Sequence, residues 1–344
     1  MTLTSAIIVT FIICTIFAQR CMLKNTVLYL PDSPTHRSLH HKTLSRSGGV
    51  AIYLAILAGA ATAGCFNLVS WFIAIVLLGA SGIAVISFLD DAFEVFCVYR
   101  FAMHLYAVSI LFALPIIPSF LELPGEMIPV TGIFGIIFLV VAGVWMVNLY
   151  NFMDGMDGFA GGMGVIGFGT LGLIGLLNAH QEYALFNLVV TAACVAFLRY
   201  NRPPALLFMG DTGATLLGYL ATVSALWGQQ LGITPFWAFI LLFSPFIIDA
   251  TVTLTGRLFR LEKVWIGQRN HFYHQILLRL GHRRTVRGYY IVMLGCATTV
   301  VLTRNATSII QWIAIIVWIT FYIGAMLAVK RLVSQRDILT VMER

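Results

Sequence analysis

Apolar segments long enough to cross about 30 Å of hydrocarbon recur along this 344-residue chain. Hydrophobic residues make up 60% of the sequence and charged residues only 10%, whereas about 25% charged residues is usual in soluble domains. In a bilayer the backbone must satisfy its own hydrogen bonds, and long apolar segments do so as helices. The sequence therefore predicts an all-α, polytopic integral membrane protein. Because no soluble segment separates the apolar ones, residues 1–344 are expected to form a single membrane-embedded domain.

The breaks between apolar segments predict about eleven transmembrane helices. The expected spans are residues 3–19, 49–67, 70–89, 101–117, 131–149, 159–177, 184–199, 213–227, 235–255, 288–302 and 309–329.

The distribution of basic residues predicts the orientation of these spans. Of the 21 Lys and Arg residues, all except Arg304 fall on the side that holds residues 20–46. By the positive-inside rule that side is cytoplasmic, which places the N-terminus outside and the C-terminus in the cytoplasm. The net charge of +7 does not indicate nucleic-acid binding, because the cations sit in short loops between apolar segments.

Carboxylates stand at the predicted cytoplasmic ends of several spans. The stretches concerned are SFLDDAFEV (87–95), NLYNFMDGMDGFAGG (148–162) and FMGDTGA (208–214). Each has a structural explanation when taken alone, since glycines in membrane helices often serve packing and an Asp before a helix is often an N-cap. Together they indicate a shared task, because an ionised carboxylate at the bilayer centre costs about 2.5–3.5 kcal/mol on insertion scales.

The shared task that fits best is the binding of a divalent cation. Asp90, Asp91, Asp154, Asp157 and Asp211 would repel one another at one membrane face unless a metal ion gathered them. Oxygen ligands favour Mg²⁺, with Mn²⁺ as an alternative, and Mg²⁺ usually leaves coordination positions to water and substrate phosphate. A metal beside Arg and Lys is the arrangement that phosphoryl transfer requires.

Two basic stretches lie on the same predicted face. PDSPTHRSLHHKTLSRSGG (31–49) is able to bind anionic groups, and KVWIGQRNHFYHQILLRLGHRR (263–284) places His271 and His274 three residues apart, so that both can share a helical face. A solvated positive-inside loop remains an alternative for each stretch. Zinc is disfavoured, because the histidines have no nearby third nitrogen or sulfur ligand.

In order and position, these motifs resemble the polyprenyl-phosphate N-acetylhexosamine-1-phosphate transferases, the superfamily that includes the phospho-MurNAc-pentapeptide translocase. The resemblance covers essentially the whole chain and is carried by Asp90-Asp91, NFMDGMDG, FMGDTG, HFYH and PTHRSLHHKTLSRSGG. Arg100 and His104 follow the paired Asp as in the bacterial branch that starts O-antigen or related surface glycans.

The resemblance implies a reaction at the cytoplasmic face of the cell inner membrane. The phosphate of undecaprenyl phosphate would attack the β-phosphorus of a UDP-N-acetylhexosamine, release UMP and leave the sugar on a lipid diphosphate, with Mg²⁺ as cofactor. A phosphate monoester is mostly dianionic at pH 7, since its second pKa is about 6, and this favours direct attack over a phospho-enzyme formed on Asp211. Homodimerisation is left open.

The resemblance also implies roles for individual residues. Asn151 and Asp211 would bind Mg²⁺, Asp90 and Asp91 would face the lipid phosphate, and Asp154 and Asp157 would lie near the nucleotide. Arg269, His271 and His274 would lie near the leaving diphosphate. Asp90, Asp91, Asp211 and both histidines are counted as catalytic. The further substrate-binding residues would be Arg46, Arg100 and Asn148.

Two departures and two rival functions accompany this interpretation. Tyr273 stands where relatives often carry an additional His, which argues against the pentapeptide translocase, and Ser45 replaces the usual Pro before Arg46. An ion-coupled transporter is the rival from another class, but transport predicts ionisable groups near mid-membrane, and here nearly all lie at one face. The exception is Asp249. It is expected to line a lipid-phosphate groove, to pair with a neighbouring cation or to make a structural polar contact between helices.

Overall fold

The computed structural model describes residues 2–33, 43–93, 95–262 and 271–342. The helices are α1 (Thr2–Met22), α2 (Gly48–Cys65), α3 (Phe72–Phe93), α4 (Cys97–Ser109), the 3₁₀ helix η1 (Ile110–Ala113), α5 (Gly132–Phe152), α6 (Phe159–Leu177), α7 (Gln181–Asn201), α8 (Gly210–Gln230), α9 (Phe236–Leu242), α10 (Ser244–Phe259), α11 (Phe272–Leu280), α12 (His282–Thr303) and α13 (Ser308–Met342). The strands are β1 (Pro31–Asp32), β2 (Leu44–Ser45), β3 (Phe120–Leu123) and β4 (Glu126–Pro129). The strands form two antiparallel hairpins, β1 with β2 and β3 with β4.

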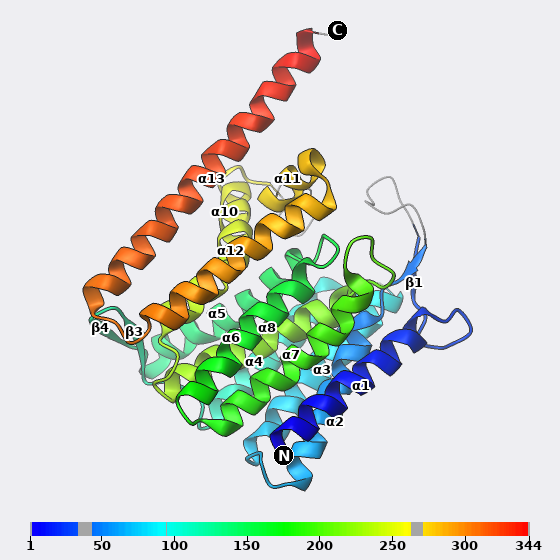
Figure 1. The fold of residues 1–344 in the computed structure, drawn as a ribbon, viewed down its shortest axis with the longest axis vertical. Coiled ribbons are helices and arrows are strands. Elements are labelled where there is room, and N and C mark those ends of the chain that lie inside the picture. Colours follow the sequence, from blue (N-terminus) through cyan, green and yellow to red (C-terminus); the bar gives the residue numbers. More distant parts are fainter. Residues whose placement is uncertain (1, 34–42, 94, 263–270, 343–344) are drawn as a thin grey trace.

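The helices form a bundle built around α8, and the long α13 extends beyond it at the C-terminal end (Figure 1). Helix α8 packs against α2, α3 and α5 and is buried along nearly its whole length. Its contact with α2 brings two backbones together, because a Cβ on Gly49 would lie 2.1 Å from the nitrogen of Gly213. Only glycine permits so close an approach.

The predicted helical membrane protein is confirmed, with eight helices in the described residues long and apolar enough to span a bilayer. The count rises to nine when α9 and α10, which meet at a bend of 80°, are taken as one broken span. The two other predicted spans coincide with α8 and with the shorter apolar segment of α4 and η1. Helix α8 is less apolar because protein rather than lipid surrounds it. That all eleven segments cross the membrane, and in which orientation, stays a prediction.

Two helix ends differ by more than four residues from the expected boundaries. Helix α12 begins at His282 rather than at residue 288, and α13 continues to Met342 rather than ending at 329. Both extensions carry basic residues, which lower the local hydropathy without interrupting a helix, so a search for apolar segments ends the span too early.

The segment around β2 is tied to the residues that precede α8. The backbone nitrogen of Phe208 donates to the carbonyl of Ser45 at 2.9 Å, and Gly48 N donates to Phe208 O at 2.9 Å. Gly49 N donates to Met209 O at 2.8 Å. These bonds bring the basic N-terminal stretch and the FMGDTG motif, about 160 positions apart along the chain, to the same end of the bundle.

Candidate active site

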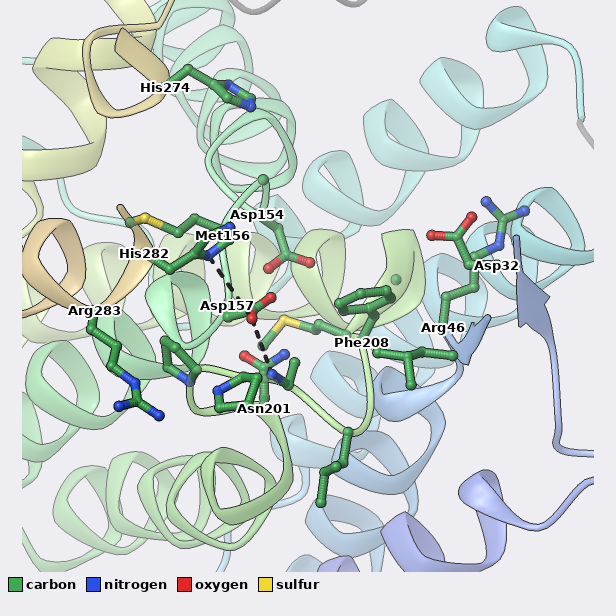
Figure 2. Close-up of a pocket in the computed structure, with 18 of the residues that line it drawn as sticks. Asp32, Arg46, Asp154, Met156, Asp157, Asn201, Phe208, His274, His282 and Arg283 are labelled. Carbon is green, nitrogen blue, oxygen red and sulfur yellow. Dashed lines mark hydrogen bonds and ion pairs between the residues drawn. The ribbon is translucent and has the colours of Figure 1, made fainter. Parts of the chain in front are cut away.

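A cavity of about 1040 Å³ lies at the end of the bundle where these segments meet. Its walls come from β2, the loop between α5 and α6, the segment before α8, and the turn between α11 and α12. Asp154 and Asp157 lie between His282 and Arg283 on one side and Arg46 on the other (Figure 2). The volume is at the upper end of the range for small-molecule sites, about 300–1,000 Å³, so the cavity has room for a large ligand.

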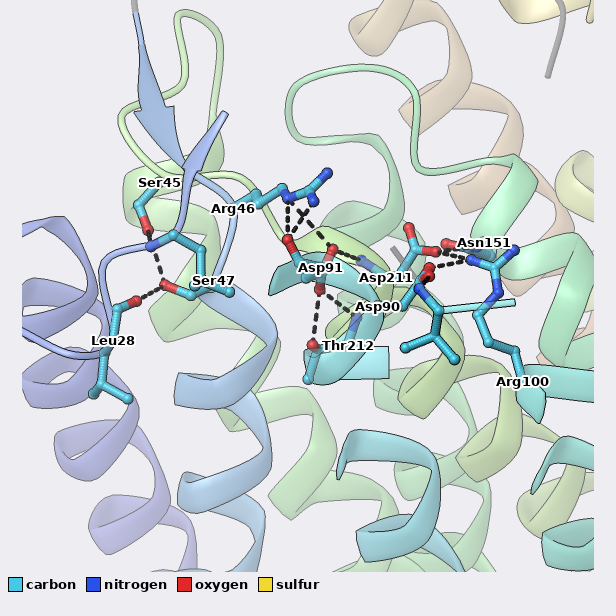
Figure 3. Close-up of polar contacts among 12 residues, drawn as sticks. Leu28, Ser45, Arg46, Ser47, Asp90, Asp91, Arg100, Asn151, Asp211 and Thr212 are labelled. Atoms are coloured by element: carbon cyan, nitrogen blue, oxygen red, sulfur yellow. Dashed lines mark hydrogen bonds and ion pairs between the residues drawn. The ribbon is translucent and has the colours of Figure 1, made fainter. Parts of the chain in front are cut away.

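Asp91 holds the N-terminus of α8 at the cavity (Figure 3). One carboxylate oxygen accepts from Asp211 N at 3.2 Å, and the other accepts from the backbone N and hydroxyl of Thr212 at 3.1 and 2.9 Å. The first N–H groups of a helix have no partner within the helix, and a carboxylate at this end satisfies them. Arg46 Nε donates to the carbonyl of Asp91 at 3.0 Å, so the basic stretch is fixed to the same point.

Asp211 lies at the centre of a second set of polar contacts (Figure 3). Its Oδ2 accepts from Arg100 at 2.9 Å and from the amide nitrogen of Asn151 at 3.2 Å. Arg100 also pairs with Asp90, whose other oxygen accepts from Val95 N at 2.8 Å. The structure therefore brings together four residues that the sequence analysis selected, from α3, α4, α5 and α8.

The loop between α5 and α6 presents Asp154 and Asp157 to the cavity. Asp157 Oδ2 accepts from Ala205 N at 3.0 Å and lies 3.9 Å from His282 Nδ1. Gly158 turns the chain into α6 with a φ of +77°, and its nitrogen donates to Asn201 Oδ1 at 2.9 Å. A left-handed residue at this point favours glycine, which explains the Asp-Gly spacing of the motif.

Electrostatic repulsion is visible at Asp154. Burial raises the pKa of its carboxyl well above the usual value, and the neighbouring carboxylates of Asp211, Asp91 and Asp157 raise the pKa further. A cation bound among these groups would offset the part of the shift that comes from the neighbouring carboxylates.

Arg283 and Arg284 line the cavity and were not selected from the sequence. Neither has an ion-pair partner among residues 2–33, 43–93, 95–262 and 271–342, so both guanidinium groups are available to an anionic ligand. Sequence reasoning missed them because HRR after Gly281 was taken as loop, whereas it forms the first turn of α12.

The two histidines of the HFYH motif face different surroundings. His274 lines the cavity, whereas His271 Nδ1 lies 3.2 Å from Asp249 Oδ1. Asp249 also accepts from the backbone nitrogens of Phe272 at 3.0 Å and Tyr273 at 2.9 Å, and thereby holds the start of α11. Asp249 therefore makes a polar contact between α10 and the start of α11, which is one of the roles expected for it.

Four of the selected residues that the structure describes do not line the cavity, namely Asp90, Arg100, His271 and Asn148. Asn148 lies one turn before Asn151 on α5, and its amide nitrogen donates to Val144 O at 2.8 Å. Arg269 falls outside the described residues, as does most of the basic stretch after Ser33. Their roles in substrate binding stay predictions.

The donor set suits magnesium better than zinc. In the part of the chain that the structure describes, no group of three or more His, Cys, Asp or Glu side chains is placed to hold a metal. Mg²⁺ does not need such a group, because it usually takes one or two carboxylates and completes its shell with water and phosphate. Asp211 and Asn151 supply adjacent oxygen-bearing side chains, and the carboxylates of Asp211, Asp91 and Asp157 add to the effect of burial in raising the pKa of Asp154.

The fold and the cavity define a polytopic helical membrane protein in which carboxylate and arginine side chains from distant helices meet at one end of the bundle. Residues 73–229 match the family described as Glycosyl transferase family 4, which is a family of enzymes. The matched region runs from α3 to α8 and includes Asp90, Asp91, Asn151, Asp154 and Asp211.

Two relatives that match most of the chain have names that refer to transferases acting on polyprenyl phosphates. A Bacillus subtilis protein named "Probable undecaprenyl-phosphate N-acetylglucosaminyl 1-phosphate transferase" is 27% identical over 305 residues, which cover 84% of this chain and 82% of the relative. A decaprenyl-phosphate N-acetylglucosaminephosphotransferase of Mycobacterium leprae is 28% identical over 83% of this chain and 80% of its own length. A phospho-N-acetylmuramoyl-pentapeptide-transferase of Chlorobaculum tepidum is 30% identical over only 31% of this chain and 28% of its own length.

Proposed function

We propose that the chain transfers N-acetylhexosamine-1-phosphate from a UDP-sugar to undecaprenyl phosphate and releases UMP. The observation that carries the proposal is the meeting of Asp211, Asn151 and Arg100 beside a cavity that also holds the unpaired Arg283 and Arg284. Carboxylates for a divalent ion next to guanidinium groups are the parts that phosphoryl transfer needs.

In the proposed reaction an oxygen of the lipid phosphate forms a bond to the β-phosphorus of the UDP-sugar. The bond from that phosphorus to the bridging oxygen breaks, and UMP leaves with the electron pair. The lipid phosphate is already mostly dianionic at neutral pH, with a second pKa of about 6, so the chain needs no strong base to activate it. The main barrier is repulsion between two anionic substrates, which Arg46 and Arg283 offset by lining the cavity.

Asp211 and Asn151 are the proposed magnesium ligands, and Mg²⁺ bound there would neutralise charge on the phosphates. Asp91 is assigned a positioning role, because both of its oxygens already accept hydrogen bonds from the start of α8. Arg100 fixes Asp211 from the side of α4. His274 is placed to approach a substrate, and His271 is placed to support the α11 segment.

The proposal includes a topology. Eleven crossings with the N-terminus outside would put the cavity at the cytoplasmic face of the cytoplasmic membrane, where a soluble UDP-sugar and a lipid phosphate can both arrive. The basic residues that line the cavity support this orientation, since they belong to the side that is rich in Lys and Arg.

N-acetylglucosamine is the proposed sugar, and the start of O-antigen or another surface glycan is the proposed role. The support is the extent of the similarity, which covers 84% of this chain for the Bacillus subtilis relative and 31% for the Chlorobaculum tepidum pentapeptide-transferase. Tyr273, buried and donating to Phe152 O at 3.2 Å, occupies the position that resembles a third histidine in the pentapeptide enzymes.

The test is UMP release by the purified protein. Undecaprenyl phosphate would be combined in turn with UDP-GlcNAc, UDP-GalNAc and UDP-MurNAc-pentapeptide, each with and without EDTA followed by excess Mg²⁺. We expect UMP only when both substrates are present, fastest with UDP-GlcNAc, abolished by EDTA and restored by Mg²⁺. If UDP-MurNAc-pentapeptide were the one UDP-sugar of the three to give UMP with undecaprenyl phosphate, the proposed sugar would be wrong. If no pair of substrates gave UMP, the proposed function would be contradicted.

A further inference from the structure

A second hollow, a groove of about 250 Å³, lies between α10, α11, α12 and α13, and no step of the proposed reaction uses it. Its wall is mostly apolar, with Phe272 from α11, Val292 from α12 and Phe321 from α13 among the lining side chains. Both α12 and α13 are long and apolar enough to span a membrane, and only 6% of the most apolar window within Ser308–Arg331 of α13 is buried. The groove therefore faces the region where lipid chains are the surrounding solvent.

One end of the groove is basic. Arg284 lines both this groove and the large cavity, and it has no ion-pair partner among the residues that the structure describes. Arg283 and Arg287 lie within the first two turns of the same helix, and α12 has no acidic residue in its first turn. The one carboxylate in the groove wall is Asp249, and its oxygens already accept from α11.

From this pairing of an apolar groove with a basic end, we propose that the groove holds one acyl chain of an anionic phospholipid whose phosphate pairs with Arg284. Anionic headgroups gather at Lys and Arg residues at the membrane surface, and an apolar groove facing lipid is filled by a hydrocarbon chain. The site does not depend on the proposed function, although its effect on turnover does.

An accessory lipid suits the groove better than the tail of the lipid substrate. Asp211 and Arg100, where the reacting phosphates are proposed to meet, belong to α8 and α4 in the part of the bundle built around α8. The groove is walled instead by α10 to α13. The two regions share Leu280 and Arg284 at their border, so a phospholipid in the groove can affect the cavity without occupying it.

The lipid would support the histidine segment. Asp249, Phe272 and Tyr289 line the groove, and Tyr289 lies 3.3 Å from Asp249, which holds the backbone of Phe272 and Tyr273. An acyl chain packed against these side chains fills space beside the start of α11. We therefore expect an anionic lipid to raise turnover by keeping His274 at the cavity wall.

Gly288 offers a way to close the groove without disturbing the fold. It lines the groove, and a Cβ added there meets nothing within 4 Å. The side chain of Gly288→Leu should therefore occupy the groove without clashing with other residues. Gly324→Leu is the matched control, because a Cβ at Gly324 on α13 also meets nothing within 4 Å, and Gly324 does not line the groove. Arg284→Gln removes the charge at the basic end.

The experiment uses the full chain in nanodiscs of phosphatidylcholine with or without phosphatidylglycerol, and counts retained lipids by native mass spectrometry. We expect wild type and Gly324→Leu to retain one phosphatidylglycerol and Gly288→Leu to retain none. Arg284→Gln should weaken retention about fivefold, the effect of one basic residue at an anionic lipid surface. Equal retention by Gly288→Leu and Gly324→Leu would overturn the proposal.

Turnover measured with saturating substrates separates the accessory lipid from the substrate tail. We expect phosphatidylglycerol to raise the turnover of wild type and Gly324→Leu, but not that of Gly288→Leu. A raised KM for undecaprenyl phosphate in Gly288→Leu, with phosphatidylglycerol retention unchanged, would assign the groove to the substrate tail and overturn the proposal. If wild type transfers no sugar phosphate at all, the proposed function fails, while the retention measurement still decides the lipid site.

Discussion

Asp91 and Thr212 are 121 positions apart in the sequence, yet one carboxylate oxygen of Asp91 accepts both the backbone N–H and the hydroxyl of Thr212. This contact joins the end of α3 to the start of α8. It fixes the position of Asp211, the neighbouring residue, whose own N–H donates to the other oxygen of Asp91.

Asp91→Ala is therefore expected to lower both stability and activity. Loss of a side chain that satisfies the first N–H groups of a helix costs about 0.5–2 kcal/mol. A displacement of Asp211 by about 1 Å would reduce turnover about 100-fold. Thermal unfolding in detergent and UMP release measure the two effects. Thr212→Ala, which removes only the hydroxyl, should show a smaller loss of each, and an equal loss would contradict the positioning role.

Asp211→Asn tests the metal assignment. Removing one electrostatic contact to a reacting centre costs about 100–1000-fold in rate, and we expect a loss of this size with insertion and purification unchanged. Asn151→Ala should instead raise the Mg²⁺ concentration needed for half-maximal rate. Turnover near that of wild type in Asp211→Asn would show that the metal binds elsewhere.

The sequence predicted that the polar residues of the motifs would lie close together. It did not predict the separate role of each carboxylate. Alternation of spans puts Asp91, Asn151 and Asp211 at one membrane face whatever the details of packing, and the structure confirms that they meet. Which carboxylate caps a helix and which remains open to a ligand depends on how α3 packs against α8. No local pattern encodes that contact.

Two further features were hidden for different physical reasons. Arg283 and Arg284 were taken as loop because charged residues at the start of a membrane helix lower its hydropathy. The role of Asp249 was left open among several alternatives because its partners belong to a helix that a search for long apolar segments does not find. These partners are the backbone nitrogens of Phe272 and Tyr273.

The raised pKa of Asp154 predicts a pH dependence of stability. Its unfolded value is about 4, and burial together with three carboxylates raises the folded value. Between the two values the folded protein holds a proton that the unfolded chain has lost, so metal-free protein should lose stability as the pH rises through this interval.

Thermal unfolding in EDTA across a pH series measures this effect. Asp154→Asn should make the decline smaller, since the amide has no proton to lose. Added Mg²⁺ should raise the wild-type melting temperature more at higher pH, where the carboxylates are ionised. The same pH slope for wild type and Asp154→Asn in EDTA would show that Asp154 is not the group responsible.

The contact between α2 and α8 predicts that alanine substitutions at two glycines of α2 change the stability of the protein very differently. A Cβ at Gly49 would lie 2.5 Å from the Cα of Gly213, whereas a Cβ at Gly64 would meet its nearest atom at 3.8 Å. Gly49→Ala should destabilise the protein by about 1–3 kcal/mol, the usual cost of overpacking. Gly64→Ala should be neutral or stabilising by up to about 1 kcal/mol. Thermal unfolding of both variants makes the comparison, and equal melting temperatures would refute the close approach.

The last prediction concerns Asp249, which we infer acts on catalysis through α11. Asp249→Ala leaves the backbone nitrogens of Phe272 and Tyr273 without their acceptor, and each unsatisfied group costs about 1–3 kcal/mol. The start of α11 should shift, and with it His274 at the cavity wall. We expect turnover to fall by up to about 100-fold.

Two further variants separate positioning from general destabilisation. Thr253→Ala removes a contact of 3.4 Å to Asp249 and leaves the bonds to α11 intact, so its turnover should stay close to that of wild type. Asp249→Asn keeps one oxygen as an acceptor and should recover part of the activity. If Asp249→Ala melts at a lower temperature but turns over like wild type well below that temperature, the carboxylate stabilises the fold without positioning the histidines.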